Sequence, residues 1–425
     1  MKIQALTGFH DILPEEALLW RQVEDQARDV FRRFGFVEIR LPILESTELF
    51  IRSIGESTDI VEKEMYTFVD KGATMRPEAT ASLLRAYIEH GLHLRQEAQR
   101  LFTIGPMFRH ERPQKGRLRQ FHQLSAELLG SSAAETDAEL IALGHSLLQQ
   151  LGISASLEIN SLGCPACRPA YRQALVEFLL ARSGELCPDC LRRVQTNPLR
   201  VLDCKQEGCR RQVRQAPSIL DSLCPPCDEH FARVRSGLET LAVPYRLNHF
   251  MVRGLDYYTR TTFEFLSNDL GAQAAVGAGG RYDGLIEQLG GPAQPGIGFA
   301  LGLERLVLLL QHQANAPATP TGIDLFIAAL GPAAAQLSFA LMHALRQQGL
   351  AVMMDHGGRG LKGQMKQAGR LGAQYVLIAG DDEIARNELV VRNMVTQEQQ
   401  SFTLINDIDE CARQLALALG PRQGA

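Results

Sequence analysis

The sequence is poor in aromatic residues and has little net charge. Aromatic side chains make up 6% of its 425 residues, there is a single tryptophan, and the formal net charge is −4. No apolar run approaches the roughly 18 residues that a membrane-spanning helix requires, so we expect no membrane association. The N-terminal residues also lack the apolar segment of a secretory signal, which favours a cytoplasmic protein. A nucleic-acid partner would have to be bound by local basic patches.

Glycine-rich nucleotide-binding motifs are absent too. The sequence contains no G-x-x-x-x-G-K-[S/T], which excludes a P-loop. The segment GIGFALG (residues 296–302) has one residue too many for a G-x-G-x-x-G fingerprint. If the protein binds ATP, side-chain cations must therefore hold the phosphates. Arginine suits this role because its planar fork pairs with two phosphate oxygens at once.

Cysteine, in contrast, is concentrated in one stretch. Eight of the nine cysteines lie between Cys164 and Cys227. In a chain without an export signal, such clustering favours metal over disulfides. Four pairs could make two closed structural zinc sites with four thiolates each. The pairs are Cys164 and Cys167, Cys187 and Cys190, Cys204 and Cys209, and Cys224 and Cys227. The sequence does not fix which pairs combine, and unmetallated or redox-sensitive thiols are the alternative.

Hydrophobic periodicity predicts a mixed N-terminal region and an α/β C-terminal region. Helical spacing predicts a helix over residues 15–34, and strands are expected over 101–109 and 120–129. Ser132 and Glu135 have capping-box spacing, which predicts that a second helix begins there. The segment 312–322, rich in Ala and Pro, indicates a linker. Beyond it, strands at 324–330, 351–355 and 374–380 alternate with helices at 332–348 and 359–371, as in a largely parallel sheet.

The loop between the first two predicted strands is strongly basic. Its cations are Arg109, Arg112, Lys115, Arg117 and Arg119. Glu111 lies two residues from Arg109 and therefore on the same strand face. A rigid root beside the core with a cationic tip suits a site for a nucleotide and RNA, whereas a solvated loop is the simpler alternative.

Five motifs along the chain resemble those of class II aminoacyl-tRNA synthetases. FGFVEIRLPILE (34–45), the basic hairpin (108–123) and GIGFALGLERL (296–306) resemble the three class motifs. RGLDYYTRTTFEF (253–265) and GAGGRYDGL (277–285) resemble signatures of the histidyl enzymes. The sequence is identified as a member of the histidyl-tRNA synthetase family. This resemblance implies an α+β catalytic domain on an antiparallel sheet, with a cysteine-rich insertion and a C-terminal α/β anticodon-binding domain.

The resemblance also implies the domain limits and the partners. Residues 1–160 and 241–315 would form the catalytic core, 161–240 the insertion, and 323–425 the anticodon-binding domain. The expected partners are L-histidine, ATP, tRNA(His) and a second copy of the chain in a homodimer. Cations of the insertion suit contact with RNA phosphates or a solvated face: Arg192, Arg193, Arg200, Lys205, Arg210, Arg211 and Arg214. Arg359, Lys362, Lys366 and Arg370 would share one helix face.

The resemblance implies activation of histidine to histidyl-adenylate by ATP, followed by transfer to the 3′ end of tRNA(His). Arg109, Glu111 and Arg305 match ATP-binding positions, where Mg²⁺ normally bridges the phosphates. Arg253 and Arg109 match the catalytic arginines that stabilise charge at the reacting phosphorus. The positions that match histidine binding are Glu78, Thr80, Gln123, Glu127, Arg253, Tyr257, Tyr258 and Tyr282.

Other interpretations of the same residues stay open. Glu78 could be an acid at a helix N-terminus, and Gln123 and Glu127 could lie on a wet sheet face. At the level of function, a catalytically inactive paralogue that senses histidine or tRNA is the main alternative. A general RNA-binding module is another, although it would leave the histidine-pocket residues without a purpose.

Overall fold

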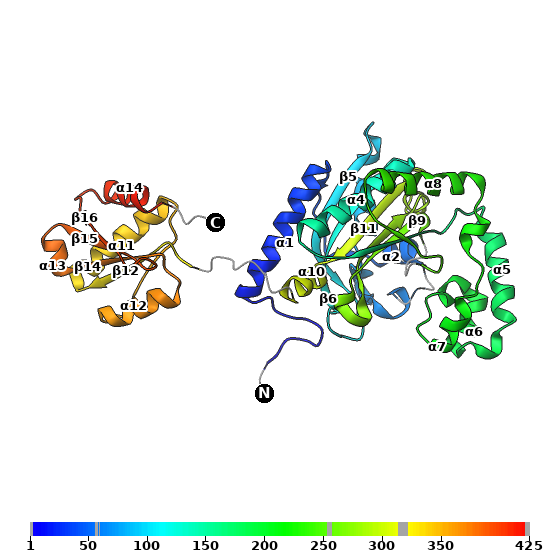
Figure 1. Cartoon of the computed structure of the whole chain (residues 1–425), viewed down its shortest axis with the longest axis horizontal. Helices are drawn as coiled ribbons and strands as arrows, with labels where there is room; N and C mark the ends of the chain where they lie inside the picture. The colour runs from blue at the N-terminus through cyan, green and yellow to red at the C-terminus, as the bar shows by residue number, and fades with distance from the viewer. Residues whose placement is uncertain (1–2, 56–57, 59, 253–256, 313–321, 421–425) are drawn as a thin grey trace. The chain divides into compact units, whose positions relative to one another are not determined.

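The protein forms two compact units, Met1–Ala316 and Pro317–Ala425 (Figure 1). The structure is a computed structural model, and it describes residues 3–55, 58, 60–252, 257–312 and 322–420. Within these residues, no helix is both long and apolar enough to cross a membrane.

An eight-stranded sheet in the order β1-β5-β6-β11-β10-β9-β7-β8 forms the centre of the first unit. Neighbouring strands from β5 to β7 are antiparallel, whereas the outer pairs β1/β5 and β7/β8 are parallel. The antiparallel sheet predicted for the catalytic domain is therefore confirmed. The strands are β1 (Val37–Glu38), β5 (Gln99–Phe108), β6 (Gln120–Leu129), β7 (Ser156–Ser161), β8 (Arg246–Leu247), β9 (Thr259–Leu266), β10 (Ala275–Arg281) and β11 (Gly296–Gly302). A small sheet beside it contains β2 (Leu44–Ser46), β3 (Tyr66–Phe68) and β4 (Ala73–Met75).

Helices α1, α4, α8 and α10 pack on one face of the large sheet and bury its apolar side chains (Figure 1). Phe31 of α1, for example, stacks on Phe102 of β5 with ring centroids 4.5 Å apart. Because side chains alternate along a strand, the opposite face of β6 presents Gln123, Ser125 and Glu127. The helices of this unit are α1 (Pro14–Arg33), α2 (Thr47–Ile54), α3 (Thr80–Glu89), α4 (Ala134–Gln150), α5 (Arg168–Leu180), α6 (Pro188–Thr196), α7 (Glu207–Val213), α8 (Pro225–Thr240), α9 (Leu285–Gln288) and α10 (Leu303–His312).

The predicted helix over 15–34 corresponds to α1, but the capping box predicted at Ser132 was wrong. Helix α4 begins at Ala134, its N-cap is Ala133, and no side chain caps it. The N-cap position is thus Ala133, one residue after Ser132. Ser132 therefore does not accept the backbone N–H hydrogen bond of a capping box.

The segment between β7 and α8 folds over a small apolar core of its own. Tyr171, Leu175 and Leu179 of α5 pack there with Val194 of α6. Cys190, Cys204 and Cys209 belong to the same core. The cysteine-rich segment is therefore a folded insertion between a strand and a helix of the catalytic unit.

The second unit is a five-stranded sheet in the order β13-β12-β14-β15-β16. Its predicted strands pair in parallel, whereas two further strands add antiparallel and were not predicted. Arg359 precedes α12 and pairs with Asp355 at 2.6 Å, so only the other three predicted cations lie on that helix. The elements are β12 (Leu325–Leu330), β13 (Val352–Met354), β14 (Tyr375–Gly380), β15 (Glu388–Asn393), β16 (Gln399–Thr403), α11 (Pro332–Gln347), α12 (Leu361–Arg370), α13 (Asp381–Ala385) and α14 (Ile408–Leu419).

Candidate active site

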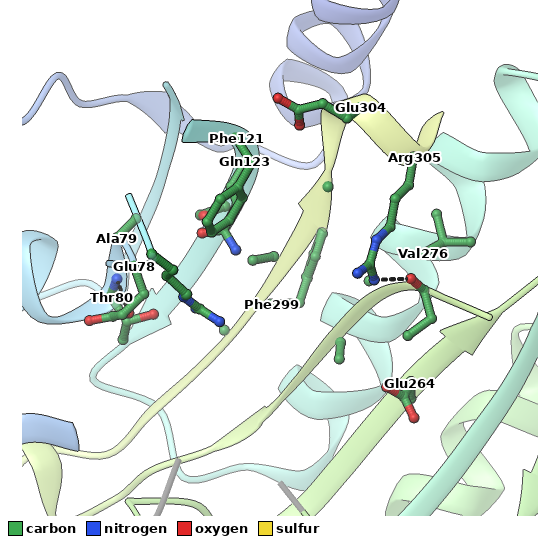
Figure 2. Close-up of a pocket in the computed structure, with 18 of the residues that line it drawn as sticks. Glu78, Ala79, Thr80, Phe121, Gln123, Glu264, Val276, Phe299, Glu304 and Arg305 are labelled. Carbon is green, nitrogen blue, oxygen red and sulfur yellow. Dashed lines mark hydrogen bonds between the residues drawn. The ribbon is translucent and has the colours of Figure 1, made fainter. Parts of the chain in front are cut away.

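A cavity of about 260 Å³ lies on the polar face of the large sheet. Strands β6, β9, β10 and β11 line it, together with the beginnings of α3 and α10 and the hairpin loop between β5 and β6. Figure 2 shows Glu78 and Thr80 on one side of the cavity and Arg305 on the other. The two sides differ in chemistry and are described in turn.

A buried carboxylate, Glu127, is held at the first side. The Thr80 hydroxyl donates to Glu127 Oε1 at 2.6 Å, and the Tyr282 hydroxyl donates to Oε2. Burial raises the pKa of Glu127 to about 8, although both hydrogen bonds act in the opposite direction. Gly298 lies opposite Glu127 in the register of β11 and β6, and a Cβ there would be 1.5 Å from Oε2. The carboxylate therefore occupies the space that a side chain at 298 would fill.

Glu78 is the second buried carboxylate of this side. It accepts hydrogen bonds from the backbone N–H groups of Thr80 (2.7 Å) and Ala81 (2.8 Å) at the start of α3. Burial raises the pKa of Glu78, partly offset by these hydrogen bonds. The interpretation of Glu78 as an acid at a helix N-terminus describes its contacts correctly. The residue also lines the cavity, so the two interpretations are compatible.

Three buried tyrosines enclose the same side. The rings of Tyr257 and Tyr258 have centroids 4.7 Å apart, and Tyr257 meets Tyr282 edge-on at 5.8 Å. Burial raises the pKa of Tyr257 and of Tyr282 well above the usual value, so both remain protonated donors at neutral pH. Tyrosine hydroxyls, a threonine hydroxyl and two carboxylates together provide donors and acceptors for a small polar ring.

Two arginines also line the cavity: Arg109 lies beside Glu78, and Arg305 lies on the opposite side. Arg109 donates through Nε to the Pro77 carbonyl (2.8 Å), and Arg305 donates through Nε to the Gly116 carbonyl (3.2 Å). Burial lowers the pKa of both guanidinium groups, because removing them from water disfavours their charged form. A bound polyanion would offset that cost. Glu111 forms an ion pair with Arg117 and lies 4.0 Å from Arg109.

Two acidic residues of this cavity, Glu264 and Glu304, are absent from the residues predicted from the sequence. Both line the cavity on the side of Arg305 (Figure 2). Glu304 accepts from the His122 backbone N–H at 2.9 Å, and one oxygen lies 3.0 Å from His122 Nδ1. Both residues belong to quoted motifs, and Glu304 directly precedes Arg305, which could have drawn attention to it. Carboxylate oxygens are typical Mg²⁺ ligands.

The structure brings the predicted site residues together, with one exception. One cavity is lined by Glu78, Thr80, Arg109, Glu111, Gln123, Tyr257, Tyr258, Tyr282 and Arg305, and Glu127 bonds to two of them. Gln123 Oε1 is buried and has no hydrogen-bond partner among the described residues, so it is available to a ligand. Arg253 lies outside the described residues.

The eight clustered cysteines form two groups of four. We name Cys164, Cys167, Cys224 and Cys227 the base cluster, and Cys187, Cys190, Cys204 and Cys209 the tip cluster. In each, the four Sγ atoms lie within 4.8 Å of one another. All eight thiols are free of disulfides. The structure thus resolves the pairing that the sequence left open.

Comparisons with known proteins agree with this architecture. The family model of histidyl-tRNA synthetases matches residues 8–306, and an anticodon-binding-domain model matches residues 324–414. A histidine–tRNA ligase of Desulfotalea psychrophila is 62% identical over 95% of this chain and 94% of its own length. One of Geobacter sulfurreducens is 55% identical over 95% and 97%. The crystal structure of apo histidyl-tRNA synthetase from S. aureus covers 97% of this chain and 99% of its own, at 36% identity and a TM-score of 0.81.

The antiparallel sheet, its cavity and the C-terminal domain define a class II aminoacyl-tRNA synthetase fold. Within that class, the chain belongs to the histidyl-tRNA synthetase family.

Glu127→Gln is expected to remove a pH dependence of stability. The pKa of Glu127 is about 8 in the folded protein against an ordinary value of 4.5, so the folded state binds more protons between these values. The stability contributed by the protonated carboxyl is fully present below about pH 4.5 and is lost as the pH rises through about 8, at up to about 1.4 kcal/mol per pH unit. Wild type should therefore lose stability relative to Glu127→Gln across this window.

Urea unfolding followed by the fluorescence of Trp20 would measure this difference. Trp20 is the only tryptophan and is buried in the first unit, so it reports on the unit that contains Glu127. Parallel pH profiles for the two proteins would contradict the raised pKa.

Proposed function

We propose that this protein activates L-histidine with ATP to form histidyl-adenylate and transfers the histidyl group to the 3′ end of tRNA(His). The observation that carries the proposal is a single cavity with two ends. One end has Glu127 between hydroxyl groups, which suits an imidazole, while Arg109, beside Glu78, and Arg305, on the opposite side, suit phosphates. The relatives named histidine–tRNA ligase support the same conclusion.

The histidine would be recognised through both of its polar ends. An imidazole has two distinct nitrogens, and Glu127 with Tyr258 can engage both. The ammonium group requires acceptors, which Glu78 and the unpartnered Gln123 Oε1 offer. An isostere that lacks the ring N–H would leave buried polar groups unpaired, so discrimination of roughly 10⁴-fold needs no editing domain.

ATP would lie across the other end of the cavity. Arg109 and Arg305 are proposed to hold the α- and γ-phosphates, and Glu111 lies near the expected position of the adenine. The ring centroid of Phe121 lies 5.4 Å from the Arg109 guanidinium carbon, and the ring offers an apolar face in the same cavity. Glu264 and Glu304 are suitable ligands for Mg²⁺, which would neutralise phosphate charge when bound.

The activation step requires charge stabilisation and no general base. The histidine carboxylate is ionised at neutral pH and attacks the α-phosphorus, and pyrophosphate leaves. Negative charge develops around that phosphorus, so cations fixed beforehand stabilise the transition state more than the ground state. Arg109 is partly buried beside the cavity, and Arg253 is proposed as the second such cation. A ribose hydroxyl of the terminal adenosine then attacks the acyl carbonyl and loses its proton, the bond between the acyl carbon and the phosphate oxygen breaks, and AMP leaves.

The proposed function also implies two binding partners outside the cavity, the tRNA anticodon and a second copy of the chain. The C-terminal unit would bind the anticodon, since unpaired bases can be read by their edges and by stacking. We further propose a cytoplasmic homodimer in which the segment 34–45 belongs to the interface. Val37, Ile43 and Leu44 are 60%, 42% and 50% exposed there, as expected of an apolar surface covered by a partner. The relatives that are 62% and 55% identical over 95% of this chain are named histidine–tRNA ligases, which favours the enzyme over the inactive regulatory paralogue.

We also propose that each thiolate cluster binds one structural zinc ion. Four ligands about 2.3 Å from a tetrahedral centre lie about 3.8 Å apart. Cys164 Sγ is 3.7 Å from Cys167 Sγ and 3.8 Å from Cys224 Sγ. In the tip cluster, Cys187 Sγ and Cys204 Sγ are 4.0 Å apart. Backbone N–H donors also point at sulfur, which favours thiolates: Cys224 N–H at Cys167 Sγ (3.1 Å) and Cys187 N–H at Cys209 Sγ (3.2 Å).

The activation step is tested by histidine-dependent exchange of labelled pyrophosphate into ATP. Wild type should catalyse the exchange, and Arg253→Ala should lower its rate about 10²- to 10³-fold with a nearly unchanged melting temperature. Arg246→Ala, on the exposed strand β8, is the matched control and should retain the rate. A folded wild-type protein that binds tRNA without any exchange would reject the enzymatic proposal in favour of the paralogue.

Gly298→Ala should weaken histidine binding selectively. The new Cβ would displace the Glu127 carboxylate and also meet the Ala126 carbonyl at 2.9 Å. Overpacking of this kind costs about 1–3 kcal/mol, so the KM for histidine in the exchange assay should rise about tenfold or more while the KM for ATP changes little. Gly284→Ala is the control, because its Cβ would meet no atom within 4 Å. An equal rise in both constants would contradict the role given to Glu127.

Metal analysis of the purified chain should give two zinc ions per chain, one for each cluster. Titration of thiols in the native protein should detect at most one, the buried Cys411, until a chelator is added. Well under one zinc per chain with all thiols titratable would reject the metal sites.

A further inference from the structure

The two thiolate clusters lie in different surroundings, although their ligands are the same. The base cluster lies where the insertion leaves and re-enters the catalytic unit. Cys164 and Cys167 follow β7, a strand of the large sheet, and Cys224 is the N-cap of α8. Phe231 and Val234 of that helix are buried in the main core. The base cluster therefore joins two elements of the catalytic unit.

The tip cluster instead borders a second hollow. A cleft of about 600 Å³ lies between the tip of the insertion and the basic hairpin. The insertion lines it with Cys187, Pro188, Asp189, Arg193, Arg200, Asp203, Cys204, Lys205 and Gln206, and the catalytic unit with Ile60, Glu64, Arg109, Glu111 and Arg117. Arg109, Glu111 and Arg117 also line the active-site cavity, so the two hollows adjoin.

The cleft is lined by both cations and acids, the acids being Glu64, Glu111, Asp189 and Asp203. The sequence offered seven cations of the insertion as possible RNA contacts, but only Arg193, Arg200 and Lys205 line the cleft. Arg192, one residue before Arg193, is not among the lining residues. Its side chain is 69% exposed, and it pairs with Asp189 at 3.6 Å. Neighbouring arginines on one helix thus differ in whether they face the cleft.

The wall that carries these cations packs on the small apolar core of the insertion. Helices α6 and α7 are short, and the insertion between β7 and α8 (residues 162–224) contains 63 residues, a size at which small domains often need a metal or disulfides. Cys190, Cys204 and Cys209 are part of its core, so the tip cluster holds α6, α7 and the Cys204–Lys205 turn together.

We infer that the tip cluster serves the transfer step, by holding Arg193 and Lys205 in a cleft wall where they contact phosphates of the RNA 3′ strand. The inference rests on the proposed function, because the 3′ end must reach the activated histidine in the adjoining cavity. A single strand carries a phosphate at each nucleotide, which suits separated cations along one wall. The base cluster, which lines neither hollow, keeps the insertion attached and folded.

Two variants of the full chain test this assignment. Cys187→Ser with Cys204→Ser removes the tip cluster, and Arg193→Gln with Lys205→Gln keeps the cluster but removes the cations. Arg192→Gln is the matched control for the cations. For each protein we would measure zinc content, pyrophosphate exchange, single-turnover transfer of histidine to a tRNA(His) transcript, and the dissociation constant of that transcript.

The cysteine variant should keep one zinc ion, exchange pyrophosphate at a rate within about threefold of wild type, and transfer histidine at least about tenfold more slowly. The cation variant should keep both zinc ions. It should also exchange pyrophosphate at nearly the wild-type rate and transfer histidine at least about tenfold more slowly. Arg192→Gln should match wild type in every measurement. Equal losses of exchange and transfer, undiminished transfer in either variant, or an Arg192→Gln defect equal to that of the cation variant would overturn the inference.

A shortened transcript that lacks the single-stranded 3′ end locates the contact. If Arg193 and Lys205 meet this strand, the cation variant should weaken binding of the full transcript severalfold and leave binding of the shortened one unchanged. An equal loss for both transcripts would overturn the contact. Because exchange needs no RNA, its absence in wild type would reject the proposed function separately, whereas its presence with unaffected transfer would reject only this inference.

Discussion

The site depends on one buried carboxylate and on the backbone that makes room for it. Glu127 projects from the polar face of β6 across β11, where Gly298 leaves the necessary space. Its two oxygens are taken by hydroxyls from α3 and from the residue after β10, so one side chain ties three parts of the fold together. Desolvation that raises the pKa of this group also strengthens its hydrogen bonds to a ligand.

Two arginines of the cavity, Arg109 and Arg305, are also ionisable groups held away from water, and their charge is positive. Arg109 and Arg305 are anchored through Nε to backbone carbonyls, which fixes the orientation of each guanidinium before a ligand arrives. Their burial destabilises the empty site, and a polyphosphate would relieve this cost. Both ends of the cavity are therefore preorganised for charges that a substrate brings, which is the arrangement that favours a charged transition state.

Local patterns in the sequence predicted much of this arrangement, and long-range contacts account for what they left out. The two-residue period of β6 placed Gln123 and Glu127 on one face, and the motifs identified the ends of the cavity. The requirement for glycine at 298 arises only when β11 pairs with β6, so no local signal reveals it. Glu264 and Glu304 were missed for a related reason, since each becomes a site residue only through the neighbours that the sheet supplies. Strands β15 and β16 have mixed polar sequences, which weakens the strand pattern.

The cysteines show the limit of spacing arguments most clearly. Spacing predicted two sites of four thiolates, but the partner of each pair depends on the path of the chain between them. The outer pairs Cys164/Cys167 and Cys224/Cys227 meet because β7 and α8 both belong to the catalytic unit, which brings the ends of the insertion together. The inner pairs are then left to each other. In this nested arrangement the base cluster lies where the insertion joins the catalytic unit, and the tip cluster lies beside the cleft. The path of the chain therefore gives two sets of four cysteines different surroundings.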